Sequence, residues 1–340
     1  MPKISVLMSV NNCELYLRQS IESIINQTFK DFEFIIVNDG SSDSSYKIIN
    51  SFHDKRIKLI NNKTKLGLSK SLNKGLKLCK SKIIARMDAD DISKRDRLEK
   101  QYQFFKENKN IDVLGGQAVL IDKDGNKIDS KHLYPISNNL AKWELLREVP
   151  FCHPAVMFRK NALEKAGLYN EKFIYAQDFE LWKRLAQLGF SFSNLPDKVI
   201  YYRKLKSDLI RGKKTEQKNA HIKILNHLFI SYGLNSNKKL VYYYYYAPKI
   251  PLKNKNLLIQ AVKISIELYD KFIVSHTLSK LDQNTISQSV AHLILNVAKV
   301  QKHLFIFSRI NLLIMGYKIC KKIITHYQFR KTLLLILINK

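Results

Sequence analysis

Three carboxylates, Asp88, Asp90 and Asp91, come directly after the apolar run Ile83–Met87. A strand that stops in carboxylates two residues apart projects both of them from one strand end. Hard divalent cations prefer oxygen ligands and can hold substrate phosphates at the same time, so this spacing suits a divalent cation site. Asp is also a common residue of solvated turns. Taken alone, the cluster is compatible with either interpretation.

The sequence offers no glycine-rich loop for phosphates. Neither G-x-G-x-x-G nor G-x-x-x-x-G-K-[ST] follows any predicted strand, so phosphates are not held by such a loop at a helix start. A metal ion is then the natural alternative for neutralising a diphosphate, which favours the cation interpretation of Asp88, Asp90 and Asp91. An EF-hand is excluded, because Ile92 and Ser93 stand where further ligands and a glycine would be needed.

Three further residues could do chemistry, and each also has a purely structural interpretation. Asp39, at a predicted strand end, could accept the N–H of a nucleobase or belong to an ordinary turn with Asp43 or Ser44 as helix N-cap. Asp178 could be a general base aimed from a helix start or merely the N-cap of that helix. From chemistry alone the structural interpretation is favoured for both. His153 is a further candidate, although a lone histidine is more often structural than catalytic.

The first half of the chain alternates short apolar runs with helix-period segments, which predicts a mostly parallel sheet covered by helices on both faces. We expect strands at Ile4–Val10, Phe32–Val37, Ile57–Ile60 and Lys82–Met87, and helices at Tyr16–Gln27, Ser44–Phe52, Leu68–Cys79 and Lys94–Glu107. Ligands of such sheets lie beyond the carboxyl ends of the strands. Asn11, Asp39 and Asp88 all fall at strand ends, so we expect them to converge on one edge.

The pattern changes after residue 110. We expect a hairpin from Val113–Ile121 through a turn at Asp122–Gly125, a helix around Trp143, a strand at Pro154–Phe158, a helix at Phe179–Leu188 closed by Gly189, and a last strand at Val199–Tyr202. Beyond about Lys204 the sequence becomes helical, Lys-rich and poor in acids. We therefore predict two domains, 1–204 and 205–340.

Charge is unevenly distributed along the chain. The 340 residues carry a formal net charge of +29, and residues 211–340 hold 22 Lys and Arg against 4 Asp and Glu. Such a segment should seek an anionic partner, either a membrane leaflet or nucleic acid. The runs Leu257–Val274 and Ile310–Ile324 pair apolar faces with lysines, as helices on an anionic bilayer do. A packed helical subdomain with a solvated basic surface is an equal alternative.

Cysteine content and hydropathy indicate the cellular compartment of the protein. The four cysteines form no C-x-x-C, so neither a zinc site nor a disulfide framework is indicated and a reducing cytoplasm fits. No apolar stretch is long enough to span a membrane, and the nearest candidates are Leu304–Tyr317 and Leu333–Ile338.

Taken together, residues 4–203 closely resemble the family 2 glycosyltransferases, which have the GT-A nucleotide-sugar fold. The matching blocks, in order along the chain, are residues 4–12, 23–29, 34–43, 66–75, 85–91 and 177–182. The resemblance implies that Asp39 contacts the base of a uridine diphosphate, Asp88 the ribose side, and that Asp90 binds Mn²⁺ or Mg²⁺. It also implies that Asp178 takes the proton from the acceptor hydroxyl and that the reaction inverts the anomeric configuration.

Further site residues are assigned on the same resemblance. Asn11, Asn73, Arg86 and His153 are predicted on the donor side, and Asp88 and Asp91 beside Asp90 at the metal. Three departures from the family pattern bear on these assignments. Asn11-Asn12 stands where many members have Tyr-Asn, and Leu72 precedes Asn73 where many have Arg. Lys204-Leu205 follows Tyr202-Arg203 where some have a metal-binding His.

The sequence thus predicts an inverting, metal-dependent hexosyl- or N-acetylhexosaminyltransferase. It would move a sugar from a nucleotide-sugar, with UDP as the expected nucleotide, to a hydroxyl of a growing surface glycan such as lipopolysaccharide, lipooligosaccharide or capsule. A lipid-linked acceptor would place it peripherally on the cytoplasmic face of the inner membrane, against the anionic leaflet, with no nucleic acid as partner. The alternatives are a basic nucleic-acid-binding protein and a catalytically inactive membrane-bound scaffold, and intact Asp88, Asp90 and Asp178 argue against the scaffold.

Overall fold

A computed structural model describes residues 1–130, 132–205 and 211–301 of the chain. The chain divides into two compact units, Met1–Ala220 and His221–Lys340. Strand β9 ends at Arg203, whereas the division between the units falls inside helix α8 (Arg211–Ser231). The domain boundary at residue 204 therefore stays a prediction.

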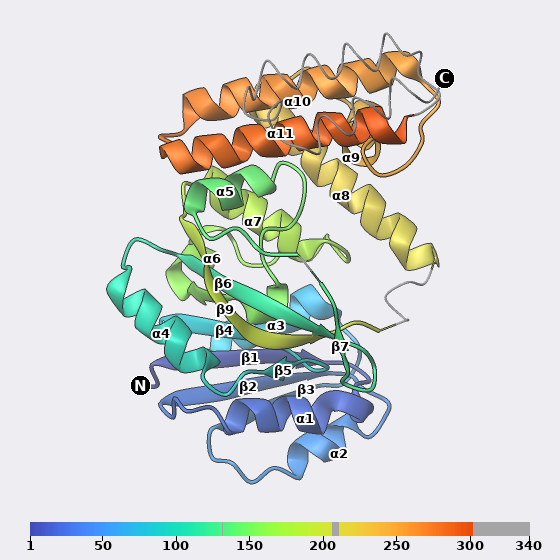
Figure 1. The fold of residues 1–340 in the computed structure, drawn as a ribbon. Coiled ribbons are helices and arrows are strands. Elements are labelled where there is room, and N and C mark those ends of the chain that lie inside the picture. Colours follow the sequence, from blue (N-terminus) through green and yellow to red (C-terminus); the bar gives the residue numbers. More distant parts are fainter. Residues whose placement is uncertain (131, 206–210, 302–340) are drawn as a thin grey trace. The chain divides into compact units, whose positions relative to one another are not determined.

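The first unit is built around one sheet, whose N-terminal half is parallel throughout. Strands β1 (Ile4–Val10), β2 (Phe32–Asp39), β3 (Ile57–Asn62) and β4 (Ile83–Asp88) lie in the order β3-β2-β1-β4 (Figure 1). Each pair in that order runs parallel. β1 and β2 read as continuous apolar runs because both of their faces are covered. The four predicted strands are confirmed, with ends that differ by two residues at most.

The second half of the sheet mixes directions. From β4 the order continues through β8 (Met157–Arg159), β6 (Val113–Ile121), β9 (Phe192–Arg203) and β5 (Ile92–Ser93), with β7 (Lys127–Ile128) paired to β6. Only β6 and β9 pair in parallel among these neighbours within the described residues. The predicted hairpin after Val113–Ile121 is confirmed by the β6–β7 pairing.

Two predicted strands differ from the structure, and a proline accounts for the first difference. His153–Ala155 forms a short 3₁₀ helix (η1), so the strand predicted at Pro154–Phe158 begins only at Met157. Proline has no N–H to donate to a ladder, which disfavours it inside a sheet. The strand predicted at Val199–Tyr202 extends back to Phe192, and its pairing with β6 skips Pro196.

Helices cover both faces of the parallel strands. The even-numbered residues of β1 (Ile4, Val6, Met8) pack in one core with Leu17 of α1 (Glu14–Ile25), Ile49 of α2 (Ser45–Asn50) and Leu98 of α4 (Arg97–Glu107). Helix α3 (Leu68–Leu78) covers the opposite face, where a Cβ on Gly75 would lie 2.3 Å from Leu7 Cδ1. Glycine is needed there because helix and strand approach closely. Helices α5 (Asn138–Glu144), α6 (Lys160–Lys165) and α7 (Gln177–Gln187) complete the unit.

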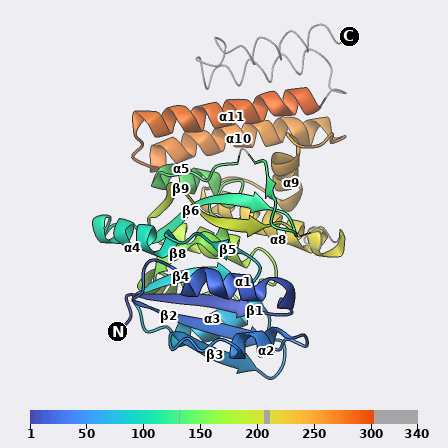
Figure 2. The same ribbon diagram turned by 60° about the horizontal axis from the view of Figure 1, so that its bottom comes forward.

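The second unit is helical in the part that the structure describes. It contains the end of α8, then α9 (Lys238–Tyr246), α10 (Lys255–Ser275) and α11 (Lys280–Val300), and α10 and α11 lie side by side (Figures 1 and 2). The basic helical C-terminal region is thus confirmed, and α10 contains the predicted run Leu257–Val274. None of the described helices is long and apolar enough to cross a membrane. The runs Leu304–Tyr317, Ile310–Ile324 and Leu333–Ile338 lie outside the described residues.

Candidate active site

The carboxyl ends of β1, β2 and β4 bring polar residues to one edge of the sheet. Asp39 is the last residue of β2, Asp88 the last of β4, and Asn11 follows β1 directly. The three strands are parallel neighbours, so their ends lie together. The Asn11 side-chain amide donates to the Asp39 carbonyl at 2.8 Å. The expected convergence of these residues is confirmed.

The three aspartates after β4 form a compact acidic cluster. One carboxylate oxygen from each of Asp88, Asp90 and Asp91 lies within 4.8 Å of the others. Asp91 is 1% exposed, and its Oδ2 has no hydrogen-bond partner among the described residues. Burial and the neighbouring charges of Asp88 and Asp90 raise the pKa of Asp91 well above its usual range. A buried oxygen without a donor beside two further carboxylates fits a hard divalent cation.

The backbone of this cluster is held by Ser20 of α1. The buried Ser20 hydroxyl lies 2.8 Å from the carbonyl oxygen of Asp88 and 2.6 Å from that of Asp91. The two carbonyls are thereby fixed at one point, which constrains the turn between them. Ser20 could not be predicted as a site residue from the sequence, because a serine on an amphipathic helix carries no local signal of this contact.

Arg86 lies buried beside the cluster. It is 2% exposed, and its guanidinium forms an ion pair with Asp88 Oδ1. Burial alone would lower the pKa of Arg86, but the Asp88 carboxylate outweighs it and the pKa is raised. Its Nε and one terminal nitrogen have no hydrogen-bond partner among the described residues. Arg86 therefore retains N–H donors for an anionic or polar ligand.

A single cleft of about 500 Å³ connects the acidic cluster with the proposed base. Arg86, Asp88, His153 and Asp178 all line it, together with Tyr134 and Tyr202 among others. Arg86, Asp88, His153 and Asp178 come from β4, η1 and the first turn of α7, which are far apart in the sequence. The structure thus places four of the predicted site residues around one cavity.

Asp178 is the second residue of α7 and not its N-cap. The N-cap position belongs to Ala176, whose φ of 55° lies in the left-handed region. Asp178 Oδ1 accepts the N–H of Phe179 at 2.8 Å. Burial raises the pKa of Asp178, although the Phe179 N–H and the charge of Arg86 counteract it. Because the N-cap is Ala176, the interpretation of Asp178 as the N-cap is wrong. A carboxylate with a raised pKa is a better proton acceptor, which suits a general base.

His153 is held as a neutral ring at the wall of the cleft. Its Nε2 lies 2.9 Å from Tyr169 Oη, and its ring also meets Trp182 edge to face. Burial, with a further contribution from the charge of Arg86, lowers the pKa of His153 well below its usual value. A neutral imidazole can exchange hydrogen bonds with a ligand but supplies no positive charge to a phosphate.

The Asp39 carboxylate is buried and accepts several hydrogen bonds from the protein itself. It is 2% exposed and accepts the backbone N–H groups of Leu66 and Gly67, each at 2.8 Å, and the Asn62 amide at 3.1 Å. Burial would raise its pKa, but these donors outweigh burial and lower it. The Ser71 side chain also helps to lower this pKa, so the roughly four acceptor positions of the carboxylate are occupied by groups of the protein. The turn after Asp39 has Ser44 in the N-cap position of α2.

Asn73 does not line the cleft, and neither do Asn11, Asp39, Asp90 and Asp91. Its amide donates to the carbonyl of Tyr169 at 2.9 Å and accepts the Tyr169 N–H at 3.0 Å, while Nδ2 also reaches Glu171 at 3.1 Å. Asn73 instead lines a separate hollow of about 430 Å³. It fixes the turn that carries Tyr169, and through Tyr169 it acts on His153.

Comparison with known proteins assigns the chain to a family. The family model described as Glycosyl transferase family 2 matches residues 5–167. An uncharacterized glycosyltransferase of Methanocaldococcus jannaschii is 37% identical over 206 residues, which cover 59% of this chain and 71% of the relative. The amylovoran biosynthesis glycosyltransferase AmsE of Erwinia amylovora is 35% identical over 214 residues, covering 62% of this chain and 79% of the relative.

A solved structure extends the fold similarity to nearly the whole chain. The S. aureus TarS fragment 1–349 in complex with UDP-GlcNAc superposes with a TM-score of 0.55 at 17% identity, covering 93% of this chain and 89% of the other. The predicted GT-A fold is thereby confirmed. With the family model over residues 5–167 and relatives above 30% identity along more than two thirds of their own length, the chain belongs to glycosyl transferase family 2 and is a glycosyltransferase.

Proposed function

We propose that this glycosyltransferase is a metal-dependent, inverting enzyme that transfers a sugar from a UDP-sugar to a hydroxyl of a surface polysaccharide. The observation that carries the proposal is the shared cleft. Asp88, from the acidic cluster, and Asp178, a carboxylate whose pKa burial raises, line one cavity of about 500 Å³. A group that holds the donor diphosphate and a base for the acceptor are the two parts that such a transfer requires.

The chemistry assigned to the residues is a single displacement. Asp178 takes the proton of the acceptor hydroxyl as its oxygen attacks the anomeric carbon. The bond between that carbon and the diphosphate oxygen breaks on the opposite side, which inverts the configuration. Arg86 donates N–H groups toward the charge that develops on the departing diphosphate. A divalent cation held by Asp88, Asp90 and Asp91 would supply further positive charge to the diphosphate.

On the donor side we propose that Asp39 and Asn11 lie at the nucleobase and that His153 contacts the sugar or diphosphate as a neutral hydrogen-bonding group. Support for a uridine donor comes from the S. aureus TarS structure, which binds UDP-GlcNAc. Asn73 takes a supporting role in this proposal, since its amide is bonded to Tyr169. The cation would be Mn²⁺ or Mg²⁺, both of which oxygen ligands suit.

On the acceptor side we propose a lipid-linked glycan at the cytoplasmic face of the inner membrane. The relative AmsE acts in amylovoran biosynthesis, which supports an acceptor of the polysaccharide class. The basic C-terminal segment, with 22 Lys and Arg against 4 Asp and Glu in residues 211–340, would favour an anionic leaflet over neutral surfaces.

The decisive experiment is a calorimetric titration of UDP into the purified protein with Mn²⁺, repeated with EDTA and with GDP and dTDP. We expect UDP to bind with Mn²⁺, to lose most of its affinity in EDTA, and to be preferred over the other nucleotides. No binding of any nucleotide under any of these conditions would overturn the proposal. Equal binding of GDP would overturn its UDP part alone.

A further inference from the structure

Arg203, the last residue of β9, has an unusual number of partners for one side chain. It is 4% exposed and contacts three segments of the first unit that are far apart in the sequence. Among the described residues no carboxylate pairs with its guanidinium. Its side-chain partners are three backbone carbonyls, one side-chain amide and one aromatic ring.

The first of these segments is the acidic cluster. Arg203 Nε donates to the backbone carbonyl of Asp90 at 2.9 Å, and the Arg203 backbone N–H donates to Asp91 Oδ1 at 2.7 Å. One residue therefore fixes both the backbone of Asp90 and the carboxylate of Asp91. Since the unpartnered Asp91 Oδ2 belongs to the same carboxylate, its direction also depends on this contact.

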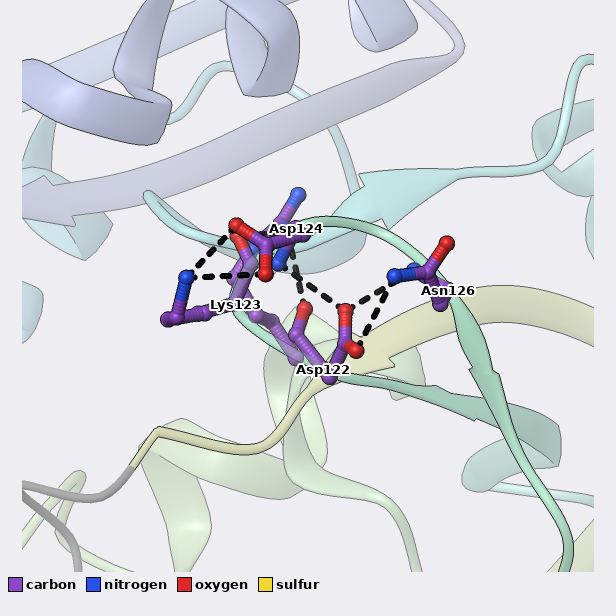
Figure 3. Close-up of polar contacts among 5 residues, drawn as sticks. Asp122, Lys123, Asp124 and Asn126 are labelled. Atoms are coloured by element: carbon purple, nitrogen blue, oxygen red, sulfur yellow. Dashed lines mark hydrogen bonds and ion pairs between the residues drawn. The ribbon is translucent and has the colours of Figure 1, made fainter.

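The second segment is the turn between β6 and β7. One terminal nitrogen of Arg203 donates to the carbonyls of Asp122 and Lys123, both at 3.1 Å. Hydrogen bonds within the turn stabilise it, because Asp122 Oδ1 accepts the N–H groups of Asp124 and Asn126, each at 2.9 Å (Figure 3). A turn stabilised by its own hydrogen bonds offers Arg203 a fixed pair of acceptors.

The third segment is helix α1. The other terminal nitrogen of Arg203 donates to Gln19 Oε1 at 3.0 Å, and its guanidinium carbon lies 4.3 Å from the centre of the Tyr16 ring. Gln19 precedes Ser20, which holds the carbonyls of Asp88 and Asp91 from the same helix. Both anchors of the acidic cluster therefore meet at α1.

We propose that Arg203 is a positioning residue for the acidic cluster, which it aligns against α1 and the β6–β7 turn. Its planar guanidinium can satisfy acceptors in several directions at once, which a lysine ammonium on a flexible chain cannot do with the same geometry. Partners that orient a ligating carboxylate commonly change metal affinity by about 10- to 100-fold when they are removed. The metal part of this inference rests on the proposed function, whereas the alignment of the cluster does not.

The test compares Arg203→Lys with Arg159→Lys. Arg159 is a matched control, because it donates to the carbonyls of Ile111, Phe105 and Asn108 at 2.8 to 3.3 Å and its guanidinium carbon lies 4.9 Å from the Phe105 ring. Among the described residues, the side-chain partners of Arg159 include none of the three aspartates. Both variants keep the positive charge and lose the planar guanidinium group. A general loss of packing or stability should therefore affect the two alike.

The first measurement is amide hydrogen exchange of the full chain without metal or nucleotide. We expect Arg203→Lys to increase exchange in residues 88–93 and 122–126, and Arg159→Lys to leave both segments unchanged. Unchanged exchange in residues 88–93 of a folded Arg203→Lys variant would overturn the inference. Gln19→Ala removes one acceptor only. It should increase exchange in the same segments to a smaller extent, and it decides the question if Arg203→Lys does not fold.

The second measurement is Mn²⁺ affinity by calorimetry. We expect a loss of about 10- to 100-fold in Arg203→Lys and none in Arg159→Lys. Equal affinity in the wild type and Arg203→Lys would overturn the functional part of the inference. A wild-type chain that binds no Mn²⁺ while Arg203→Lys still increases exchange would support the positioning role and count against the proposed metal dependence.

Discussion

Arg86 and Asp88 form an ion pair in which the guanidinium is 2% exposed and the carboxylate 29% exposed. The pair is therefore buried on one side only. Asp88 is open to water, whereas Arg86 is almost fully buried at the wall of the cleft and has two nitrogens without hydrogen-bond partners among the described residues. Removal of one partner of a fully buried pair is costly because a charge is left unsolvated. Here the remaining Asp88 could be solvated, so substitution of Arg86 tests binding more than folding.

Arg86→Met should separate donor binding from metal binding. Loss of charge-assisted donors costs about 1.5–3 kcal/mol, which corresponds to a roughly tenfold or larger loss of UDP affinity in the presence of Mn²⁺. Affinity for Mn²⁺ alone should be unchanged or higher, because Asp88 loses a competing cation. Calorimetry with Mn²⁺ alone and then with UDP measures both. Weaker Mn²⁺ binding together with unchanged UDP affinity would contradict the role proposed for Arg86.

Asp178→Asn should impair the chemical step without impairing donor binding. General-base catalysis contributes about 10²- to 10⁴-fold, so kcat should fall by that factor. The UDP affinity should stay the same, because Asp178 faces the acceptor in the proposed mechanism. Sugar transfer to a glycan acceptor and UDP titration provide the two readouts. As a control on the same helix, Glu180→Gln removes a carboxylate that pairs with Arg184, and it should retain far more activity. Full activity of Asp178→Asn would refute the base assignment.

Asp178 should also make the stability of the fold depend on pH. Burial raises the pKa of Asp178 in the folded chain, so the folded state binds its proton more tightly than the unfolded state does. The carboxyl therefore stabilises the fold at pH values below its unfolded pKa, and this contribution is lost as the pH rises through the folded pKa. Asp178→Asn, which stays neutral, should have a higher Tm than the wild type at neutral pH. That difference should shrink in acid. A Tm difference that does not change with pH would speak against the raised pKa.

The parallel half of the sheet and its carboxyl-end residues could be predicted from sequence because the signals are local. Strands buried on both faces read as continuous apolar runs, and the residue after each run falls at the ligand edge. These local signals predict that Asn11, Asp39 and Asp88 lie together, as they do in the structure. The resemblance to the family then supplied the distant partner, Asp178, which no local pattern could connect to Asp88.

The supporting contacts were not predictable, because they join segments that are remote in the sequence. Arg203 and Gln19 are separated by 184 residues, and Ser20 and Asp91 by 71. Each has an ordinary residue type for its strand or helix. Asn73 shows the converse, since its place in a family block suggested a donor contact, whereas its amide is bonded to Tyr169. Only the tertiary fold determines which neighbour a polar side chain meets.

The loop that engages Asp39 depends on Gly67, and this dependence yields a further prediction. Gly67 has a φ of 96° and donates its N–H to Asp39 Oδ2 at 2.8 Å. No heavy atom lies within 4 Å of a Cβ added there, so an alanine would be strained by its backbone angle and not by a clash. Gly67→Ala should cost about 1–3 kcal/mol of unfolding free energy. It should also weaken UDP binding, because relief of the unfavourable φ would shift the backbone N–H of residue 67, which donates to Asp39.

Gly189→Ala is the matched control for Gly67→Ala. Gly189 has a φ of 83° and equally open surroundings, but it follows the end of α7, where its N–H donates to the carbonyl of Ala186. An alanine there should lower the unfolding free energy by a similar amount and leave UDP affinity nearly unchanged. Chemical denaturation and calorimetric titration of both variants measure the two quantities. If both variants lost UDP affinity equally, the effect would follow from general destabilisation, and the role of Asp39 at the nucleobase would lose its support.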